Sequence, residues 1–259
     1  MWRAARWLSL RDLESVNIKS VLSYPPPRSS GETNFIALAA NAGVPVVRIG
    51  TCTFLTSACT KTAYGRAHHG IEAYAEHHGY PVVTLRPNWF MDNLLFAAQE
   101  IKASGQITYP TTGTGPPTAM IDPRDLASAA AHILMLPGDL LATFVAAKTI
   151  EVHGKEMIDL HENVEALSKA VGYPIKINAV PYEPWVEAVV GTGMPRVFAE
   201  SFGSTILKVD GAMEPDGPMV QTTSPLLTST NWTPKYGVDD WATSPKVIEA
   251  LRKDEKSEL

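Results

Sequence analysis

Cysteine is scarce in this chain: Cys52 and Cys59 are the only two among 259 residues, and they form no C-x-x-C pair. Two thiols cannot build the disulfide framework of a small secreted domain, so a reducing compartment is expected. The cytoplasm is therefore the expected location.

Basic stretches and long apolar runs are lacking as well. The formal net charge is -5 and no basic stripe appears, so nucleic acid is not expected as a partner. Charges and Ser9 interrupt the basic segment 1–10, which therefore lacks the apolar core of a signal peptide, and no later run is long enough to span a bilayer. The pattern predicts a globular protein that does not enter membranes.

Short β-branched runs alternate with helical patterns over the first two-thirds of the chain, which is typical of a parallel sheet covered by helices. Gly43, Gly79 and Gly105 are placed to end helices, and Asp122 is placed to cap one that has Pro123 at its first position. The expected strands cover 18–23, 44–49, 81–85 and 106–109, and the expected helices cover 9–16, 32–41, 64–78, 89–103 and 122–136.

The pattern changes from about Thr143. A strand at 144–152, a helix at 158–171, a strand at 175–180, helical stretches around Trp185 and Phe202, a long loop at 210–234 and a final helix at 238–252 are expected. We therefore divide the chain into a parallel-sheet domain, 1–150, and a smaller α+β region, 151–259. Trp185, Met194, Phe198 and Phe202 fit the wall of a substrate cleft and the core of that region equally well.

Three segments carry a resemblance to a known family. They are a strand that ends in prolines (Ile18–Pro27), the run Leu-Arg-Pro-Asn-Trp-Phe-Met-Asp-Asn (Leu85–Asn93), and the run Ile-Asp-Pro-Arg-Asp-Leu-Ala (Ile121–Ala127). Their order and spacing resemble the NmrA-like branch of the atypical short-chain dehydrogenases. Fungal ergot-alkaloid dehydrogenases share the proline-ended strand and the RP-x-WFM-x-N run.

The resemblance implies an α/β fold, with a Rossmann-like parallel sheet and a small C-terminal α+β substrate domain. It also implies NADP as cofactor, a small specialised metabolite as substrate, and reduction of a C=N, C=C or C=O bond. Segments at the ends of three strands would then contact the cofactor. Their residues are Tyr24, Pro25, Pro26, Thr51, Pro87, Asn88, Trp89, Phe90 and Asn93. Asn88 is also expected to cap the next helix, and the alternative for Trp89 and Phe90 is a plain helix core.

The glycine-rich phosphate loop of that family is not found in the sequence. Gly31, Gly43 and Gly50 do not have its G-x-x-G-x-x-G spacing, and Gly113-x-Gly115 is followed by two prolines, which indicates a loop. We expect the chain to be truncated at the N-terminus, which would leave 18–23 at an exposed sheet edge and favour a homodimer. An incomplete gene model is the alternative.

Tyr64 and His68 are the candidate catalytic residues. They stand where ordinary short-chain dehydrogenases have Tyr-x-x-x-Lys, whose tyrosine exchanges a proton with the substrate. Glu72 follows His68 by one helical turn and could orient the imidazole. The alternative is an exposed helix face with a solvated ion pair.

Two other functions stay open on the same fold. One is a cofactor-independent cyclase or isomerase in which Tyr64 or His68 acts as acid or base, and the other is a non-catalytic NAD(P)-sensing regulator. No metal is expected, because the paired histidines are adjacent on a helix and point in different directions. Asp122 and Asp125 are expected to stabilise a helix start and not to form a catalytic pair.

Overall fold

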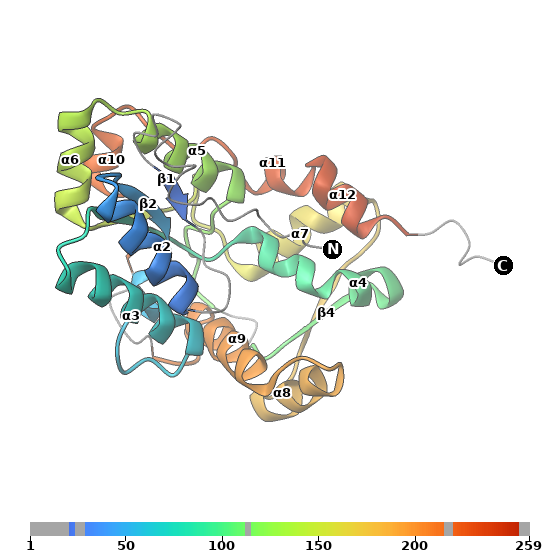
Figure 1. Ribbon diagram of the computed structural model, residues 1–259. Coiled ribbons are helices and arrows are strands. Elements are labelled where there is room, and N and C mark those ends of the chain that lie inside the picture. The colour runs from blue at the N-terminus through green and yellow to red at the C-terminus, as the bar shows by residue number, and fades with distance from the viewer. Residues whose placement is uncertain (1–20, 24–28, 112–114, 215–219, 254–259) are drawn as a thin grey trace.

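A computed structural model describes residues 21–23, 29–111, 115–214 and 220–253 (Figure 1). The predicted helix 9–16 and three predicted cofactor contacts, Tyr24, Pro25 and Pro26, lie outside the described residues. Within those residues, no helix is both long and apolar enough to cross a bilayer.

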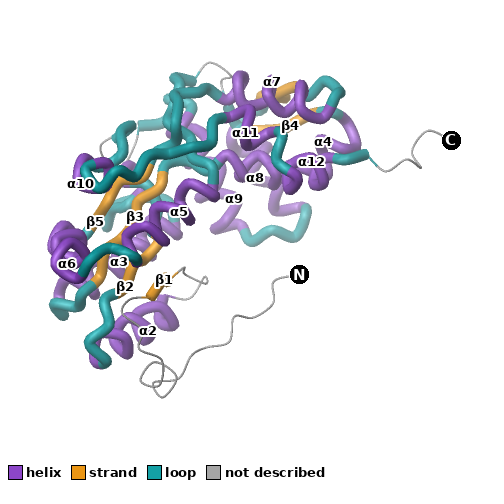
Figure 2. The backbone as a smooth tube through the Cα atoms, turned by 90° about the horizontal axis from the view of Figure 1, so that it is seen from above, coloured by secondary structure: helices purple, strands orange, loops and turns teal. Residues whose placement is uncertain are grey.

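The main sheet has four parallel strands in the order β1-β2-β3-β5. They are β1 (Val21–Ser23), β2 (Val46–Ile49), β3 (Val82–Pro87) and β5 (Thr149–Val152), and Figure 2 shows them side by side. The predicted α/β architecture with a parallel sheet is confirmed. Strand β1 pairs with β2 at one end of this order, and a homodimer through that edge stays a prediction.

Helices cover both faces of the main sheet, as a parallel sheet requires. On one face α2 (Ser29–Asn41) and α3 (Ala63–His77) pack over Val46 and Val82. On the other face α5 (Pro123–Leu134), α6 (Gly138–Ala147) and α10 (Pro225–Thr228) pack over Val47 and Val83. Successive valines point to opposite faces because the side-chain period of a strand is two residues.

A second hydrophobic cluster lies beyond the main sheet, around Leu94, Ile107, Trp185 and Trp241. It is built from two parallel strands, β4 (Gln106–Tyr109) and β6 (Lys176–Ala179), and from the helices α4 (Ala98–Ser104), α7 (Leu160–Val171), α8 (Tyr182–Gly191), α9 (Arg196–Val209), α11 (Val238–Ala242) and α12 (Pro245–Leu251). The cluster draws on residues from both sides of position 150, and β5 spans that position. The boundary at 150 stays a prediction.

The predicted strand 144–152 is wrong in its first half. Residues up to Ala147 belong to α6, and only Thr149–Val152 form a strand. Leu141 and Phe144 are three residues apart, so a helix turns both toward the sheet, where both are buried. The spacing of the large apolar residues therefore indicates the helix that forms here, whereas the continuous apolar run had suggested a strand.

Three other element predictions need correction. The predicted helix 89–103 begins as a 3₁₀ helix, η2 (Met91–Ala97), which α4 continues, and its N-cap is the extended Phe90 and not Asn88. The predicted final helix is two short helices, because Pro245 begins α12. The predicted loop 210–234 contains α10.

Helix α5 confirms the predicted cap. The Asp122 carboxylate accepts the backbone N–H of Arg124 at 2.8 Å, and Pro123 follows at the first helical position. The buried Asp125 carboxylate accepts the backbone N–H groups of Lys235 at 2.9 Å and Tyr236 at 3.0 Å. Both carboxylates therefore stabilise the fold, and Asp125 holds the C-terminal segment against α5.

Replacing Asp122 with alanine should lower the free energy of unfolding by about 1 kcal/mol, as the loss of a helix cap does. Urea denaturation measures this change. Asp139→Ala is the control, since Asp139 is exposed in the first turn of α6 and that helix has no side-chain cap. An Asp122→Ala protein with unchanged stability would contradict the capping role.

Candidate functional site

A cleft of about 710 Å³ opens at the carboxyl ends of β2 and β3. Open α/β sheets bind their ligands at this end, and the volume lies within the range of about 300–1,000 Å³ typical of small-molecule sites. The lining side chains are apolar or carry uncharged polar groups, apart from the titratable Tyr64, His68 and Cys52.

Helix α3 forms one wall. Its residues Ala63, Tyr64, Ala67, His68 and Ile71 line the cleft, because a spacing of three and four places them on one helical face. The strand ends supply Thr51, Pro87, Asn88, Trp89, Phe90 and Asn93. The structure thus brings together every predicted site residue that it describes.

Helix α9 and the segment before it form the opposite wall. The Phe202 ring stacks on Trp89, with centroids 5.5 Å apart, and on Phe198, with centroids 5.7 Å apart. Met194, Phe198 and Phe202 line the cleft, which agrees with the predicted cleft wall and not with the alternative of a plain core. Trp185 belongs to the core: it is buried, and its Nε1–H donates to the Thr108 carbonyl at 2.7 Å.

His68 is held by Arg48 and not by the predicted Glu72. The Arg48 Nη2 group donates to His68 Nδ1. Burial, together with the positive charge of Arg48, lowers the pKa of His68 from 6.5 to about 3. The imidazole is therefore neutral at pH 7. Because a guanidinium only donates hydrogen bonds, Nδ1 must accept, and the ring hydrogen is on Nε2.

Arg48 of β2 is fully buried, and carboxylates neutralise its positive charge. Its Nε donates to Glu32 of α2 at 2.7 Å, and its Nη1 lies 3.6 Å from Glu72 of α3. Glu72 also pairs with Arg86 of β3 at 2.5 Å. Glu72 points to these two arginines and its side chain is only 13% exposed, so its predicted role toward His68 is wrong, and so is the alternative of a solvated ion pair on an exposed helix face.

Tyr64 connects α3 to α9. Its hydroxyl is hydrogen-bonded to Thr205 Oγ1 and lies 3.4 Å from the Ser201 carbonyl. Since Thr205 Oγ1 itself donates to the Ser201 carbonyl at 2.9 Å, the Tyr64 hydroxyl is the donor to Thr205. Tyr64 also lines the cleft, so this contact fixes its side chain at the cleft wall.

Asn88 uses its side chain to hold the turn after β3. Its Oδ1 accepts the Trp89 N–H at 2.6 Å, and its Nδ2 lies 3.0 Å from both His153 Nδ1 and Gln221 Oε1. All hydrogens of this amide are therefore used within the protein. Asn88 shapes the cleft through the turn that it stabilises.

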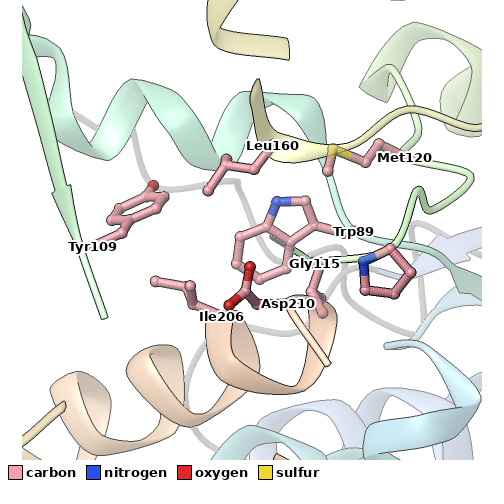
Figure 3. A pocket seen from close by; sticks show the side chains of 9 residues that line it. Trp89, Tyr109, Gly115, Met120, Leu160, Ile206 and Asp210 are labelled. Atoms are coloured by element: carbon pink, nitrogen blue, oxygen red, sulfur yellow. The ribbon is translucent and has the colours of Figure 1, made fainter. Parts of the chain in front are cut away.

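Trp89 also separates the cleft from a second, much smaller cavity. That cavity has a volume of about 20 Å³ and is lined by Trp89, Tyr109, Met120, Leu160 and other residues (Figure 3). It has room for about one water molecule.

Cys52 in the main cleft is buried. Burial raises the pKa of its thiol to about 12, so this thiol is not a nucleophile at neutral pH.

The described residues fit the nicotinamide end of a dinucleotide cofactor. The strand ends at Thr51 and at Pro87–Trp89 border a cleft of uncharged side chains, which suits an uncharged dihydronicotinamide ring. Thr51 and the turn held by Asn88 would hold the ring. In the described part of the chain, no group of three or more His, Cys, Asp or Glu side chains could hold a metal.

Sequence reasoning missed Arg48 and much of the α9 wall. A lone arginine inside the run Val46–Ile49 was a signal for a buried charge that needs a partner. Pro195, Phe198, Ser201, Phe202 and Thr205 have helical spacing, which indicates one shared face. Sequence spacing alone does not show that this face lies against α3.

No family model matches the chain. An NAD(P)H azoreductase of Xenophilus azovorans is 33% identical to it over 117 residues, which are 45% of this chain and 38% of the azoreductase. The chain thus matches well under half of the length of this curated relative.

Solved structures resemble the chain over most of its length. An NADPH-dependent quinone oxidoreductase of Escherichia coli superposes with a TM-score of 0.66 at 18% identity, over 91% of this chain and 79% of that one. A Citrobacter triphenylmethane reductase complexed with NADP(H) has a TM-score of 0.64 at 17% identity, over 94% and 81% of the two chains. NmrA, a negative transcriptional regulator, has a TM-score of 0.63 at 12% identity, over 93% and 79%. The chain therefore shares the Rossmann-like α/β fold of these solved structures, which is the fold that the sequence motifs imply.

Proposed function

We propose that this protein is an NAD(P)H-dependent reductase of a small, largely apolar molecule, and that the reaction takes place in the 710 Å³ cleft. The observation that carries the proposal is the meeting of Tyr64, His68 and the turn after β3 around one cleft at the carboxyl ends of the strands. The azoreductase, the quinone oxidoreductase and the triphenylmethane reductase that resemble the chain support it by their activities.

When bound, a reduced nicotinamide cofactor supplies a hydride, so that NAD(P)H and one proton reduce an acceptor by two electrons and leave NAD(P)⁺. The protein's own residues orient the acceptor and exclude water. The stacked rings of Trp89, Phe202 and Phe198 offer a flat apolar wall for it. Phe96 and Val197 line the cleft and are 63% and 54% exposed, so they border its opening to solvent, from which the proton arrives.

The geometry gives less support to the cofactor-independent cyclase or isomerase. A general base works best when its pKa is near the operating pH, whereas the pKa of His68 is about 3. His68 therefore does not act as a base at neutral pH. A neutral imidazole still acts as a hydrogen-bond donor, which suits a reaction that develops negative charge on the acceptor.

The purified chain should bind NADPH or NADH and oxidise it when an acceptor is present. Calorimetric titration measures binding, and the fall in NADPH absorbance measures turnover with a naphthoquinone, an azo dye and a triphenylmethane dye. Binding without turnover on any acceptor would favour the sensing regulator. A folded, monodisperse sample that binds neither cofactor would overturn the reductase and leave the cofactor-independent enzyme.

His68→Ala should lower kcat by about 10²- to 10³-fold, as the loss of one preorganised hydrogen-bond donor does. His69→Ala is the matched control, because His69 is the next residue of α3 and is not part of the cleft lining. Steady-state kinetics of the two variants test the assignment. Full turnover by His68→Ala would show that this side chain takes no part.

Tyr64→Phe should lower kcat by about 10²-fold or more, because in our proposal the hydroxyl relays the solvent proton to the reduced acceptor. It should also lower the free energy of unfolding by about 1 kcal/mol, because the hydrogen bond to Thr205 is lost. Kinetics and urea denaturation separate the two effects, with Tyr74→Phe on the same helix as control. A loss of stability with unchanged turnover would show that Tyr64 only holds α9 in place and takes no part in the reaction.

A further inference from the structure

We propose that Arg48 positions His68 as a fixed hydrogen-bond donor to the substrate, and that the substrate has an oxygen or nitrogen lone pair at the double bond that accepts the hydride. This inference rests on the proposed function and names the substrate class of the same cleft. The observation behind it is the buried contact from Arg48 Nη2 to His68 Nδ1.

The guanidinium of Arg48 is fixed in one orientation by its partners. Its side chain has no exposed surface, and its Nε donates to Glu32 of α2 at 2.7 Å. Its Nη1 lies 3.6 Å from Glu72 of α3. Anchored from two helices, the guanidinium leaves its Nη2 edge for His68. Arg48 touches His68 and is not part of the cleft lining, so it is a positioning residue and not a catalytic one.

The contact decides which ring nitrogen of His68 carries the hydrogen. A guanidinium has donors only, so Nδ1 accepts and the neutral ring holds its hydrogen on Nε2. Within the described residues, the one hydrogen bond of this ring is the contact at Nδ1, and His68 lines the cleft. Its Nε2–H is therefore the donor that remains for a ligand.

The groups around His68 keep it neutral. Arg48 stands against the ring, Glu32 and Glu72 neutralise Arg48, and Arg86 takes the other oxygen of Glu72. From α9, the cleft wall opposite presents phenylalanines and hydroxyl groups, which carry no charge. A carboxylate beside the ring would favour imidazolium, and here that position is filled by a cation instead.

A fixed Nε2–H favours one class of acceptor. When a hydride adds to one end of a C=O, C=N or N=N bond, the π electron pair moves to the oxygen or nitrogen at the other end. The negative charge that develops there is stabilised by the N–H, with the cation of Arg48 behind the ring, and a proton from solvent completes the reduction. An isolated C=C bond has no such atom. We therefore expect quinone-like carbonyls, imines or azo compounds to be reduced and isolated alkenes to be left unchanged.

Histidine ¹⁵N NMR of the full chain without cofactor tests the first half of the proposal. In the wild type, His68 should carry its hydrogen on Nε2 and stay neutral from pH 7 down to about pH 4. Arg48→Met alone would leave Glu32 buried without its cation, so the variant to use is the double change Glu32→Gln with Arg48→Met. In it the pKa of His68 should rise from about 3 but stay below the ordinary value of about 6.5, because the adjacent cation is gone while the burial of the ring remains.

Arg66→Met is the matched control, since Arg66 lies on α3 and donates to the Thr60 carbonyl, away from His68. It should leave the His68 resonances unchanged. A wild-type His68 with its hydrogen on Nδ1, or one that titrates near pH 6.5, would overturn the proposal. So would a double variant whose His68 behaves as in the wild type.

Ligand additions to the same samples test the second half. A naphthoquinone should shift the Nε2 resonance of wild-type His68, and naphthalene, which has the same rings without a carbonyl oxygen, should not. Equal shifts, or no shift with either ligand, would overturn the donor role. Because no cofactor is present, these results are independent of whether NADPH is later found to bind, so a failed reductase assay and a failed donor assignment are distinguishable.

Discussion

The cleft depends on one buried cation, Arg48. Moving a guanidinium out of water costs several kcal/mol, and the cost is offset only if its partners are held in place. Those partners come from both helices on one face of the sheet: Glu32 from α2, and Glu72 and His68 from α3. Any rotation of α3 that removed its side chains from the cleft would also separate Arg48 from two of its partners. The buried charge thus fixes the helix that presents Tyr64 and His68.

The same polar network continues under the cleft to the other strand ends. Arg86 of β3 joins Glu72 to Thr53, and the Thr53 hydroxyl donates to Glu151 of β5. Next to Glu151 on this edge of the sheet, His153 meets the amide of Asn88. Hydrogen bonds and ion pairs therefore cross-link β2, β3 and β5 where the ligand would bind. Among the described residues, Arg48 Nη1, Glu151 Oε2 and His153 Nε2 still lack a hydrogen-bond partner. The charged residues of this network are not part of the cleft lining, whose side chains are uncharged.

Local signals in the sequence were sufficient for much of the fold. The glycines after α2 and α4 were placed correctly because Gly43 and Gly105 have φ of 70° and 67°, a conformation that other residues rarely adopt. The turn after β3 was predicted from Pro87 and from the aromatic residues Trp89 and Phe90. Phe144 was misassigned because an apolar run of this length fits a buried strand and a buried helix equally, and only packing decides between them. The partners of Arg48 and the meeting of α3 with α9 join residues far apart in the chain, and single-sequence patterns carry no information on such pairs.

The electrostatics of the cleft connect the buried network to the chemistry. Burial beside a cation lowers the pKa of His68, so the imidazole cannot serve as a base at neutral pH. The same neutral ring can still donate a hydrogen bond through Nε2. Acid–base enzymes need a group that changes its charge near the working pH, and such a group would be disfavoured next to Arg48. A reduction needs something different, a dipole that is already oriented when negative charge appears on the acceptor. An imidazole that does not titrate near neutral pH supplies that dipole, and the arginine that adds to the effect of burial on its pKa also directs its hydrogen. On physical grounds, then, the feature that argues against isomerisation in this cleft is the one that supports the proposed reduction.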